Sequence, residues 1–86
     1  YATGPKGEAL TTDVAVLGPA DARQTLLVVS GTHGVEGYAG SGAQMGFLTQ
    51  PAFTTTPSDT RIVLIHALNA HGFAWNRRVT EDNVDL

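Results

Sequence analysis

The sequence contains no cysteine, few basic residues and no long apolar run. Without cysteine there is no disulfide, no thiolate metal ligand and no cysteine nucleophile. Five Lys and Arg against eight Asp and Glu give a net charge of −3, which excludes a nucleic-acid binder that works through a basic surface. No run approaches the roughly 18 apolar residues of a membrane span, and the N-terminus carries no basic-then-apolar signal. These absences favour a cytoplasmic protein that binds neither nucleic acid nor membrane.

The remaining composition is that of a folded domain. Hydrophobic residues make up 42% of the chain and charged residues 15%, which is too apolar and too weakly charged for a disordered tail. A chain of 86 residues buries only about 60% of the surface that its unfolded form exposes, so its stability alone is marginal. It starts at Tyr1 rather than Met and stops at Leu86 within a polar run. We therefore expect residues 1–86 to form a single partial domain.

Two unbroken apolar runs predict the strands of a covered sheet. Thr25–Ser30 and Arg61–Leu68 hold consecutive large apolar residues without alternation, which is typical of strands buried on both faces. Between them, Glu36–Gln50 is the only segment long enough for a helix, so the middle of the chain predicts a βαβ unit with parallel strands. A shorter β-prone run, Asp13–Leu17, is expected to pair antiparallel with residues 25–30 through a short loop. The predicted fold class is α/β, with a mixed, mainly parallel sheet and flanking helices.

Glycine is frequent in and before the predicted helix. Within it, glycines at positions 37, 40, 42 and 46 are each unfavourable for an isolated helix by about 1 kcal/mol against Ala. We expect close packing of the helix backbone on the sheet to compensate. The glycines of the preceding turn are expected to adopt backbone angles that favour this residue; they are Gly31, Gly34 and Gly37.

The first candidate site is the turn Ser30–Gly37, which follows the first parallel strand. In open α/β sheets, ligands bind at the carboxyl ends of such strands. His33 and Glu36 are three residues apart and can converge on one cation, and zinc accepts nitrogen and oxygen ligands together. The alternative is a solvated His33, with Glu36 stabilising the N-terminus of the helix.

The second candidate segment is Asn69–Arg78, which follows the other parallel strand. Guanidinium groups match carboxylates and carbonyls in geometry, so the adjacent Arg77 and Arg78 can grip a carboxylate or polarise a carbonyl. The alternative is that one or both form surface ion pairs, which are worth little, with the acidic residues that follow: Glu81, Asp82 and Asp85.

The remaining histidines and the aromatic residues have simpler interpretations. His66 lies within an apolar strand and is expected to be a hydrogen-bonded core residue. His71 is expected in an exposed turn and is an alternative third metal ligand. Phe73 and Trp75 are expected to pack this turn onto the domain.

Three motifs occur in a recognisable order along the chain. They are His33-Gly-Val-Glu36, Asn69-Ala-His-Gly72 and Arg78-Val-Thr-Glu-Asp-Asn-Val-Asp85-Leu86. The order resembles the zinc carboxypeptidase superfamily, which has His-x-x-Glu after a strand, an Asn-Pro-x-Gly-like turn, an Arg and then Asp-Leu-Asn-Arg. The chain is most similar to a bacterial family of unknown function near the succinylglutamate desuccinylase and aspartoacylase branch. It departs from the pattern at Ala70, where Pro is usual, and at Thr80, where many members have Asn.

The resemblance implies a zinc carboxypeptidase-like α/β sandwich and a zinc-dependent hydrolase of an amide or peptide bond. His33 and Glu36 would be two of three protein ligands to one zinc ion, with water at the open position. Arg78 would polarise the scissile carbonyl, and either Arg78 or Arg77 would bind the substrate. The substrate would be a small peptide or an acylated amino acid. The third ligand and the general base lie further downstream in the family, so the C-terminal remainder of the same protein would complete the site.

A second hypothesis comes from a different functional class. Because the chain stops before the family's remaining site residues, it is alternatively a non-catalytic binding or assembly module that retains half of the fold.

Overall fold

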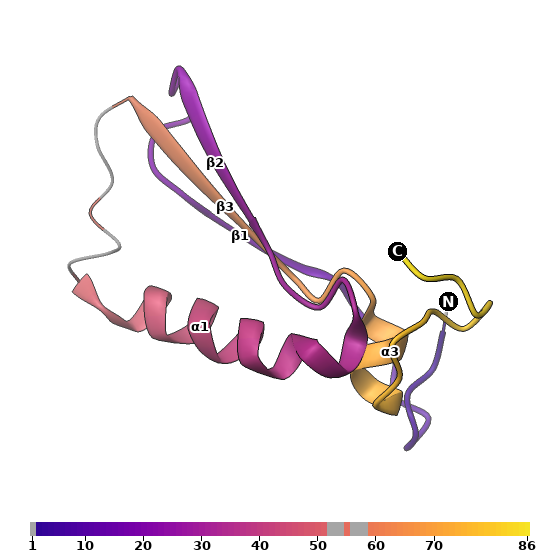
Figure 1. Ribbon diagram of the computed structural model, residues 1–86. Helices are drawn as coiled ribbons and strands as arrows, with labels where there is room; N and C mark the ends of the chain where they lie inside the picture. Colours follow the sequence, from indigo (N-terminus) through magenta and orange to yellow (C-terminus); the bar gives the residue numbers. More distant parts are fainter. Residues whose placement is uncertain (1, 52–54, 56–58) are drawn as a thin grey trace.

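The computed structural model describes residues 2–51, 55 and 59–86, in which three strands form one sheet (Figure 1). The strands are β1 (Asp13–Leu17), β2 (Gln24–Val29) and β3 (Thr60–His66), and they lie in the order β1-β3-β2. β2 runs parallel to β3, whereas β1 runs antiparallel to it. All three predicted strands are therefore present, and the described fold is α/β with a small mixed sheet.

The position of β1 corrects the sequence prediction, because β1 pairs with β3 and not with β2. Contacts at both ends attach it there. The Thr12 hydroxyl donates to the Ala67 carbonyl at 2.9 Å, just beyond the end of β3. At the other end, the Arg61 guanidinium donates to the carbonyls of Pro19 and Ala20. β3 is therefore the central strand of the sheet, with β1 on one side and β2 on the other.

In residues 2–51, 55 and 59–86, helices α1 and α3 accompany the sheet. A single 3-10 turn, η1 (Gly34–Glu36), leads directly into α1 (Gly37–Thr49), which confirms the predicted helix. A second helix, α3 (Ala70–Trp75), replaces the turn expected after β3. No helix in the described part of the chain is long and apolar enough to cross a membrane.

Two glycines allow α1 to approach the sheet closely. A Cβ atom on Gly37 would lie 2.8 Å from the Cα atom of Gly31, and one on Gly40 would lie 2.7 Å from the Cβ atom of Ser30. At these positions the expected packing of the helix backbone on the sheet is confirmed. A Cβ atom on Gly42 or on Gly46 would meet nothing within 4 Å among the described residues, so the expected packing is wrong for these two glycines, which weaken the helix without a packing gain.

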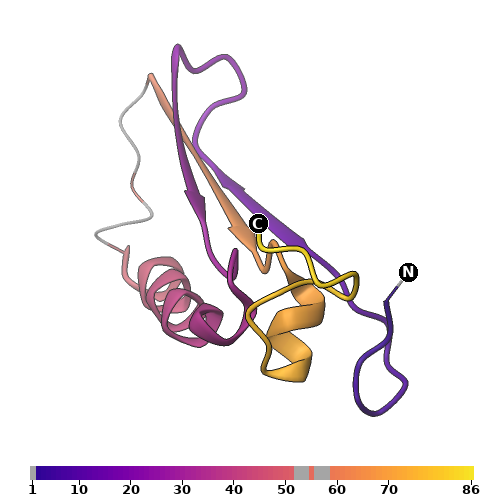
Figure 2. The same ribbon diagram turned by 45° about the vertical axis from the view of Figure 1, so that its right-hand side comes forward.

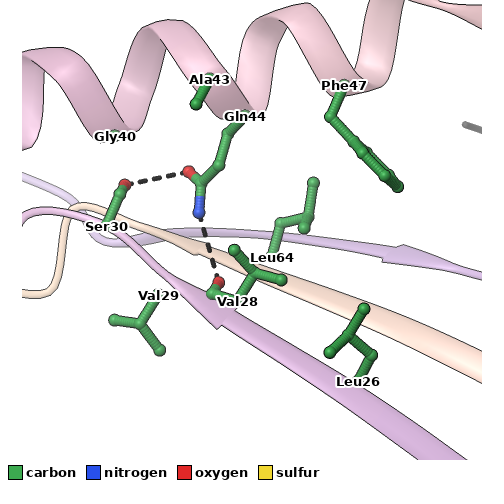
Figure 3. Close-up of a pocket in the computed structure, with 9 residues that line it drawn as sticks. All are labelled: Leu26, Val28, Val29, Ser30, Gly40, Ala43, Gln44, Phe47 and Leu64. Atoms are coloured by element: carbon green, nitrogen blue, oxygen red, sulfur yellow. Dashed lines mark hydrogen bonds between the residues drawn. The ribbon is translucent and has the colours of Figure 1, made fainter.

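Gln44 is the polar link between α1 and the sheet (Figure 3). Its carbonyl oxygen accepts from the Ser30 hydroxyl at 2.9 Å, and its amide nitrogen donates to the carbonyls of Val28 at 3.2 Å and Ile65 at 3.1 Å. Both Gln44 and Ser30 are buried, and the buried Leu64 lies beside the link in an apolar hollow. Since Ser30 immediately follows β2, the link holds the beginning of the candidate turn against the helix.

The other face of the sheet is apolar and exposed in the described residues. Side chains alternate along a strand, so Val14, Val16 and Leu27 lie on the face away from the buried Ile62 and Leu64. Val14, Val16 and Leu27 are 57%, 58% and 57% exposed, respectively. The expectation of strands buried on both faces is therefore wrong for residues 2–51, 55 and 59–86, because α1 lies along one face only (Figure 2).

Candidate functional site

The turn between β2 and η1 presents His33 and Glu36 at the carboxyl end of β2. Gly31 has φ +69, and a Cβ atom there would lie 2.8 Å from the Cβ atom of Ala67. Glycine is therefore needed at this position both for its backbone angle and for space. Unlike Gly31, the other two glycines of the turn have ordinary φ angles, and their small size matters instead. His33 is the N-cap residue of η1 and Glu36 is its last residue, so a single helical turn separates them.

Helix α3 leads the chain from β3 to the arginines. Asn69 is its N-cap, and its side chain accepts from the Gly72 amide at 2.8 Å. Asn76 ends the helix in the left-handed region with φ 54, a conformation that Asn tolerates better than most residues. This reversal directs Arg77 and Arg78 back toward η1.

Aromatic contacts pack α3 onto the rest of the fold, as the sequence predicts. The Phe73 ring stacks on Tyr38 of α1 with centroids 4.5 Å apart, and it meets His66 edge-on at 5.1 Å. The indole of Trp75 donates to the carbonyl of Thr3 at 2.9 Å. Contacts with α1 and with the N-terminal segment at Thr3 therefore fix the position of α3 and of the arginines that follow it.

The two candidate segments lie directly against each other. A Cβ atom on Gly34 would lie only 1.9 Å from the carbonyl carbon of Gly72, so η1 and α3 touch backbone to backbone. The amide of Gly34 donates to the Arg78 carbonyl at 3.4 Å, and that of Val35 donates to the Arg77 carbonyl at 3.2 Å. The arginine segment is thus paired with the turn that carries His33 and Glu36.

Four side chains meet where these segments join, and we refer to them as the His33 cluster: His33, Glu36, Arg78 and Asp85. The imidazole Nδ1 of His33 lies 3.1 Å from Glu36 Oε2, and its Nε2 lies 3.1 Å from Asp85 Oδ1. Arg78 contacts the other three members, with Nε 3.0 Å from Asp85 Oδ2, a terminal nitrogen 3.5 Å from Glu36 Oε1 and another 3.0 Å from His33 Nε2. The sequence-predicted residues His33, Glu36 and Arg78 are therefore brought together.

Exposure limits what the cluster contributes to stability. The His33 side chain is 24% exposed, whereas those of Glu36, Arg78 and Asp85 are 65%, 52% and 52% exposed. Ion pairs this accessible are screened by water and contribute at most about 1 kcal/mol each. The surface pairing considered for the arginines does occur between Arg78 and Asp85. The cluster is better understood as an arrangement of polar atoms on the surface than as a stabilising core.

The geometry of His33 and Glu36 fits two ligands of one metal ion. Ligands about 2.0–2.2 Å from a tetrahedral zinc ion lie roughly 3.3–3.6 Å from each other. Nδ1 and Oε2 are 3.1 Å apart at hydrogen-bond distance, so a small outward shift of either side chain would reach that separation. Asp85 faces the other ring nitrogen of His33. It is therefore not placed as a further ligand of an ion that Nδ1 and Glu36 would share. In keeping with this, the described residues contain no group of three or more His, Cys, Asp or Glu side chains placed to hold a metal ion. The pair therefore offers one nitrogen and one oxygen donor, which is fewer than a zinc site needs.

The other candidate residues lie outside the cluster. Arg77 contributes its carbonyl oxygen to the backbone pairing with Val35. His66 is half-buried and its Nδ1 lies 3.1 Å from the Ser30 hydroxyl, as expected for a hydrogen-bonded core residue. His71 lies in α3, not in an exposed turn; it stacks on Trp75, and its buried Nε2 has no partner among the described residues. The structure therefore does not bring His71 into the cluster.

Sequence reasoning missed the roles of Asp85 and Asn69. The sequence places Asp85 in the third motif and predicts it as a surface partner for the arginines, and the structure adds a contact with His33 to the one with Arg78. Asn69 donates its side-chain amide to the Arg78 carbonyl at 3.1 Å. The three-residue spacing from Asn69 to Gly72 was an available signal, because Asn is a preferred N-cap residue.

The described chain is thus an α/β protein in which His, Glu and Arg side chains meet at the carboxyl edge of two parallel strands. Residues 1–86 match the family described as "Protein of unknown function (DUF2817)", and the chain belongs to that family. No curated protein and no solved structure matches the chain with significant similarity.

Proposed function

We propose that the chain is part of a zinc-dependent hydrolase that cleaves an amide or peptide bond. The observation that carries this proposal is the 3.1 Å approach of His33 Nδ1 to Glu36 Oε2, with the Arg78 guanidinium in the same cluster. The resemblance to the zinc carboxypeptidase superfamily adds support, and we propose the corresponding α/β sandwich for the whole domain. The small mixed sheet is compatible with that architecture.

His33 and Glu36 would hold the metal, His33 through Nδ1 and Glu36 through its carboxylate. When bound, zinc would lower the pKa of a water molecule at its open position and so supply a nucleophile. In the metal-bound form, Nε2 of His33 would carry the proton and donate to Asp85, which leaves Nδ1 free of a proton. The Arg78 nitrogen that lies 3.0 Å from Nε2 would then turn away from the ring, as its proposed contact with the substrate requires. The short turn η1 keeps both ligand side chains on one rigid element.

Arg78 would act on the substrate. Its guanidinium is half-exposed and can turn toward a carbonyl oxygen that develops negative charge. In the described arrangement its donors face the carboxylates of Asp85 and Glu36, so a substrate oxygen would share or replace one of these contacts. Arg77 is the neighbouring cation, and we propose it as a second contact for a carboxylate of the substrate.

The rest of the machinery would come from outside these residues. The resemblance implies that a third zinc ligand and a general base belong to the C-terminal remainder of the protein. The proposed substrates are small peptides or acylated amino acids, and the described residues do not distinguish between these two classes.

The first experiment substitutes Glu36 in the complete protein. Glu36→Gln removes the charge of one ligand while keeping its size, so bound zinc and hydrolysis of a panel of dipeptides and N-acyl amino acids should both fall strongly. Glu81→Gln is the matched control, since Glu81 lies outside the His33 cluster beside Thr80 and His71. Full zinc content and activity in the Glu36 variant would contradict the proposal.

The exposed apolar sheet face favours a second candidate function, a non-catalytic binding or assembly module. Val14, Val16 and Leu27 present apolar surface with no cover in the described residues, and such surfaces mark interaction sites. Native mass spectrometry of the complete protein separates the two candidates. An assembly that carries no zinc and hydrolyses none of the panel would favour the module over the hydrolase.

A further inference from the structure

Asn69 is a buried junction between the two halves of the site. Only 3% of the residue is exposed. Its backbone amide donates to the Gly31 carbonyl at 2.7 Å, its side-chain oxygen accepts from the Gly72 amide at 2.8 Å, and its side-chain nitrogen donates to the Arg78 carbonyl at 3.1 Å. One residue therefore joins the turn after β2, the start of α3 and the arginine segment.

The chemistry of this position requires an amide side chain. The Gly72 amide needs an acceptor and the Arg78 carbonyl needs a donor, and Asn offers one of each on a short side chain. Aspartate would cap the helix equally well but would place an oxygen against the Arg78 carbonyl. The space is also closed, because a Cβ atom on Gly72 would lie 2.6 Å from the Asn69 side-chain nitrogen. The amide is held in one orientation.

The hydrogen bond from Asn69 to the Arg78 carbonyl helps to determine where the Arg78 guanidinium lies. The Arg78 carbonyl accepts from Asn69 and also from the Gly34 amide at 3.4 Å, so the arginine backbone is fixed relative to η1. The guanidinium itself is half-exposed and held only by accessible ion pairs. The partly buried hydrogen bond from the buried Asn69 is therefore the firmer constraint on where Arg78 can reach.

From this geometry we propose that Asn69 is a positioning residue for Arg78. It sets the backbone of Arg78 so that the guanidinium meets His33 and Glu36, and it does not itself touch the substrate. The catalytic part of this inference rests on the proposed hydrolase function, whereas the structural part does not.

The test uses Asn69→Asp in the complete, zinc-loaded protein, with Gln50→Glu as the matched control. Gln50 is the exposed C-cap residue of α1 and lies outside the His33 cluster, so the control makes the same amide-to-carboxylate change away from the arginine segment. Asn69→Asp should lower kcat about 10- to 100-fold with unchanged zinc content, because small misplacements of a catalytic group have effects of this size. Asn69→Ser, which keeps a capping oxygen but cannot reach Arg78, should give the same loss and covers the case in which the Asp variant does not fold.

A double-mutant cycle separates positioning from general structural damage. In an Arg78→Ala background, Asn69→Asp should cost less than about twofold, because the group that it positions is already absent. An undiminished loss in that background would overturn the proposal.

A spectroscopic measurement decides the inference even if no hydrolysis is found. The Arg78 Nε–H signal in a ¹H–¹⁵N spectrum, assigned by its disappearance in Arg78→Lys, should move in Asn69→Asp and stay in place in Gln50→Glu. Failure of the hydrolase proposal alone would leave this shift intact. An unmoved signal in Asn69→Asp would overturn the role of Asn69.

Discussion

Glu36 and Asp85 approach His33 from its two ring nitrogens, each at 3.1 Å. Glu36 faces Nδ1 and comes from the same helical turn, whereas Asp85 faces Nε2 and comes from the far end of the described chain. A histidine ligand commonly donates its second ring nitrogen to a carboxylate, which raises its basicity and fixes its orientation. The two acidic residues therefore have different functions in the proposed site, one as a ligand and the other as support for a ligand.

Removing the Asp85 carboxylate should weaken zinc binding without abolishing it. Asp85→Asn loses the contact that orients His33, and supporting partners of this kind typically account for 10- to 100-fold in metal affinity. The affinity is measured by competition with a chromogenic chelator. Asp82→Asn removes the same charge from the same acidic run but lies outside the His33 cluster, so it should have little effect. Equal losses in the two variants would point to net charge instead of orientation.

The two adjacent arginines should differ sharply in their effect on hydrolysis. Of the two arginines, Arg78 is the one whose side chain contacts His33 and Glu36 in the described part of the chain. Arg78→Ala should therefore lower kcat/KM by about 10²- to 10³-fold, the usual effect of losing an oxyanion donor. Arg77→Ala should lower it by less than about tenfold, chiefly through KM. Steady-state kinetics on the best substrate of the panel provides the comparison. A larger loss for Arg77→Ala would transfer the proposed role to Arg77.

Two glycine-to-alanine substitutions should change stability in opposite directions. Gly34→Ala would place a Cβ atom 1.9 Å from the Gly72 backbone, and this overlap should lower the free energy of unfolding by at least about 2 kcal/mol. Gly46→Ala meets open space within α1 and should raise it by about 0.5–1 kcal/mol, because alanine favours the helix. Urea denaturation of the complete protein measures both. A tolerated Gly34→Ala would mean that η1 and α3 do not touch as described.

Local patterns were sufficient to predict the strands, the helix and the parallel pair. The apolar runs Thr25–Ser30 and Arg61–Leu68 and the intervening helix follow from hydrophobicity and chain length, and the observed strands end at Val29 and His66, one and two residues earlier. The partner of β1 did not follow, because neighbours in sequence usually pair and a short loop favoured β2. The contacts of Thr12 with Ala67 and of Arg61 with Pro19 select β3 instead, and such distant pairings leave no local pattern.

The site was predictable to a similar extent. His33, Glu36 and the pair Arg77-Arg78 stand out because their residue types and their positions after parallel strands suit metal and carbonyl chemistry. The preference for Arg78 over Arg77 comes from the family resemblance and not from the residue types. Helix α3 was missed, since its six residues include a glycine and depend on caps at both ends. Without α3, the reversal at Asn76 and the contact of Asp85 with His33 could not be anticipated. Both depend on the path of the chain between residues 69 and 85.

The strand order β1-β3-β2 also determines when the sheet can form. Neither outer strand has a partner in this sheet until residues 60–66 are available, since β1 and β2 do not pair with each other in the described sheet. During synthesis, β1 and β2 therefore lack their native hydrogen bonds in this sheet until the ribosome has released the residues of β3. All strand pairing in this sheet joins residues distant in sequence, which slows folding and leaves apolar strands open to misassociation in the meantime. Assembly of the sheet, and with it of the His33 cluster, should begin only when the central strand arrives.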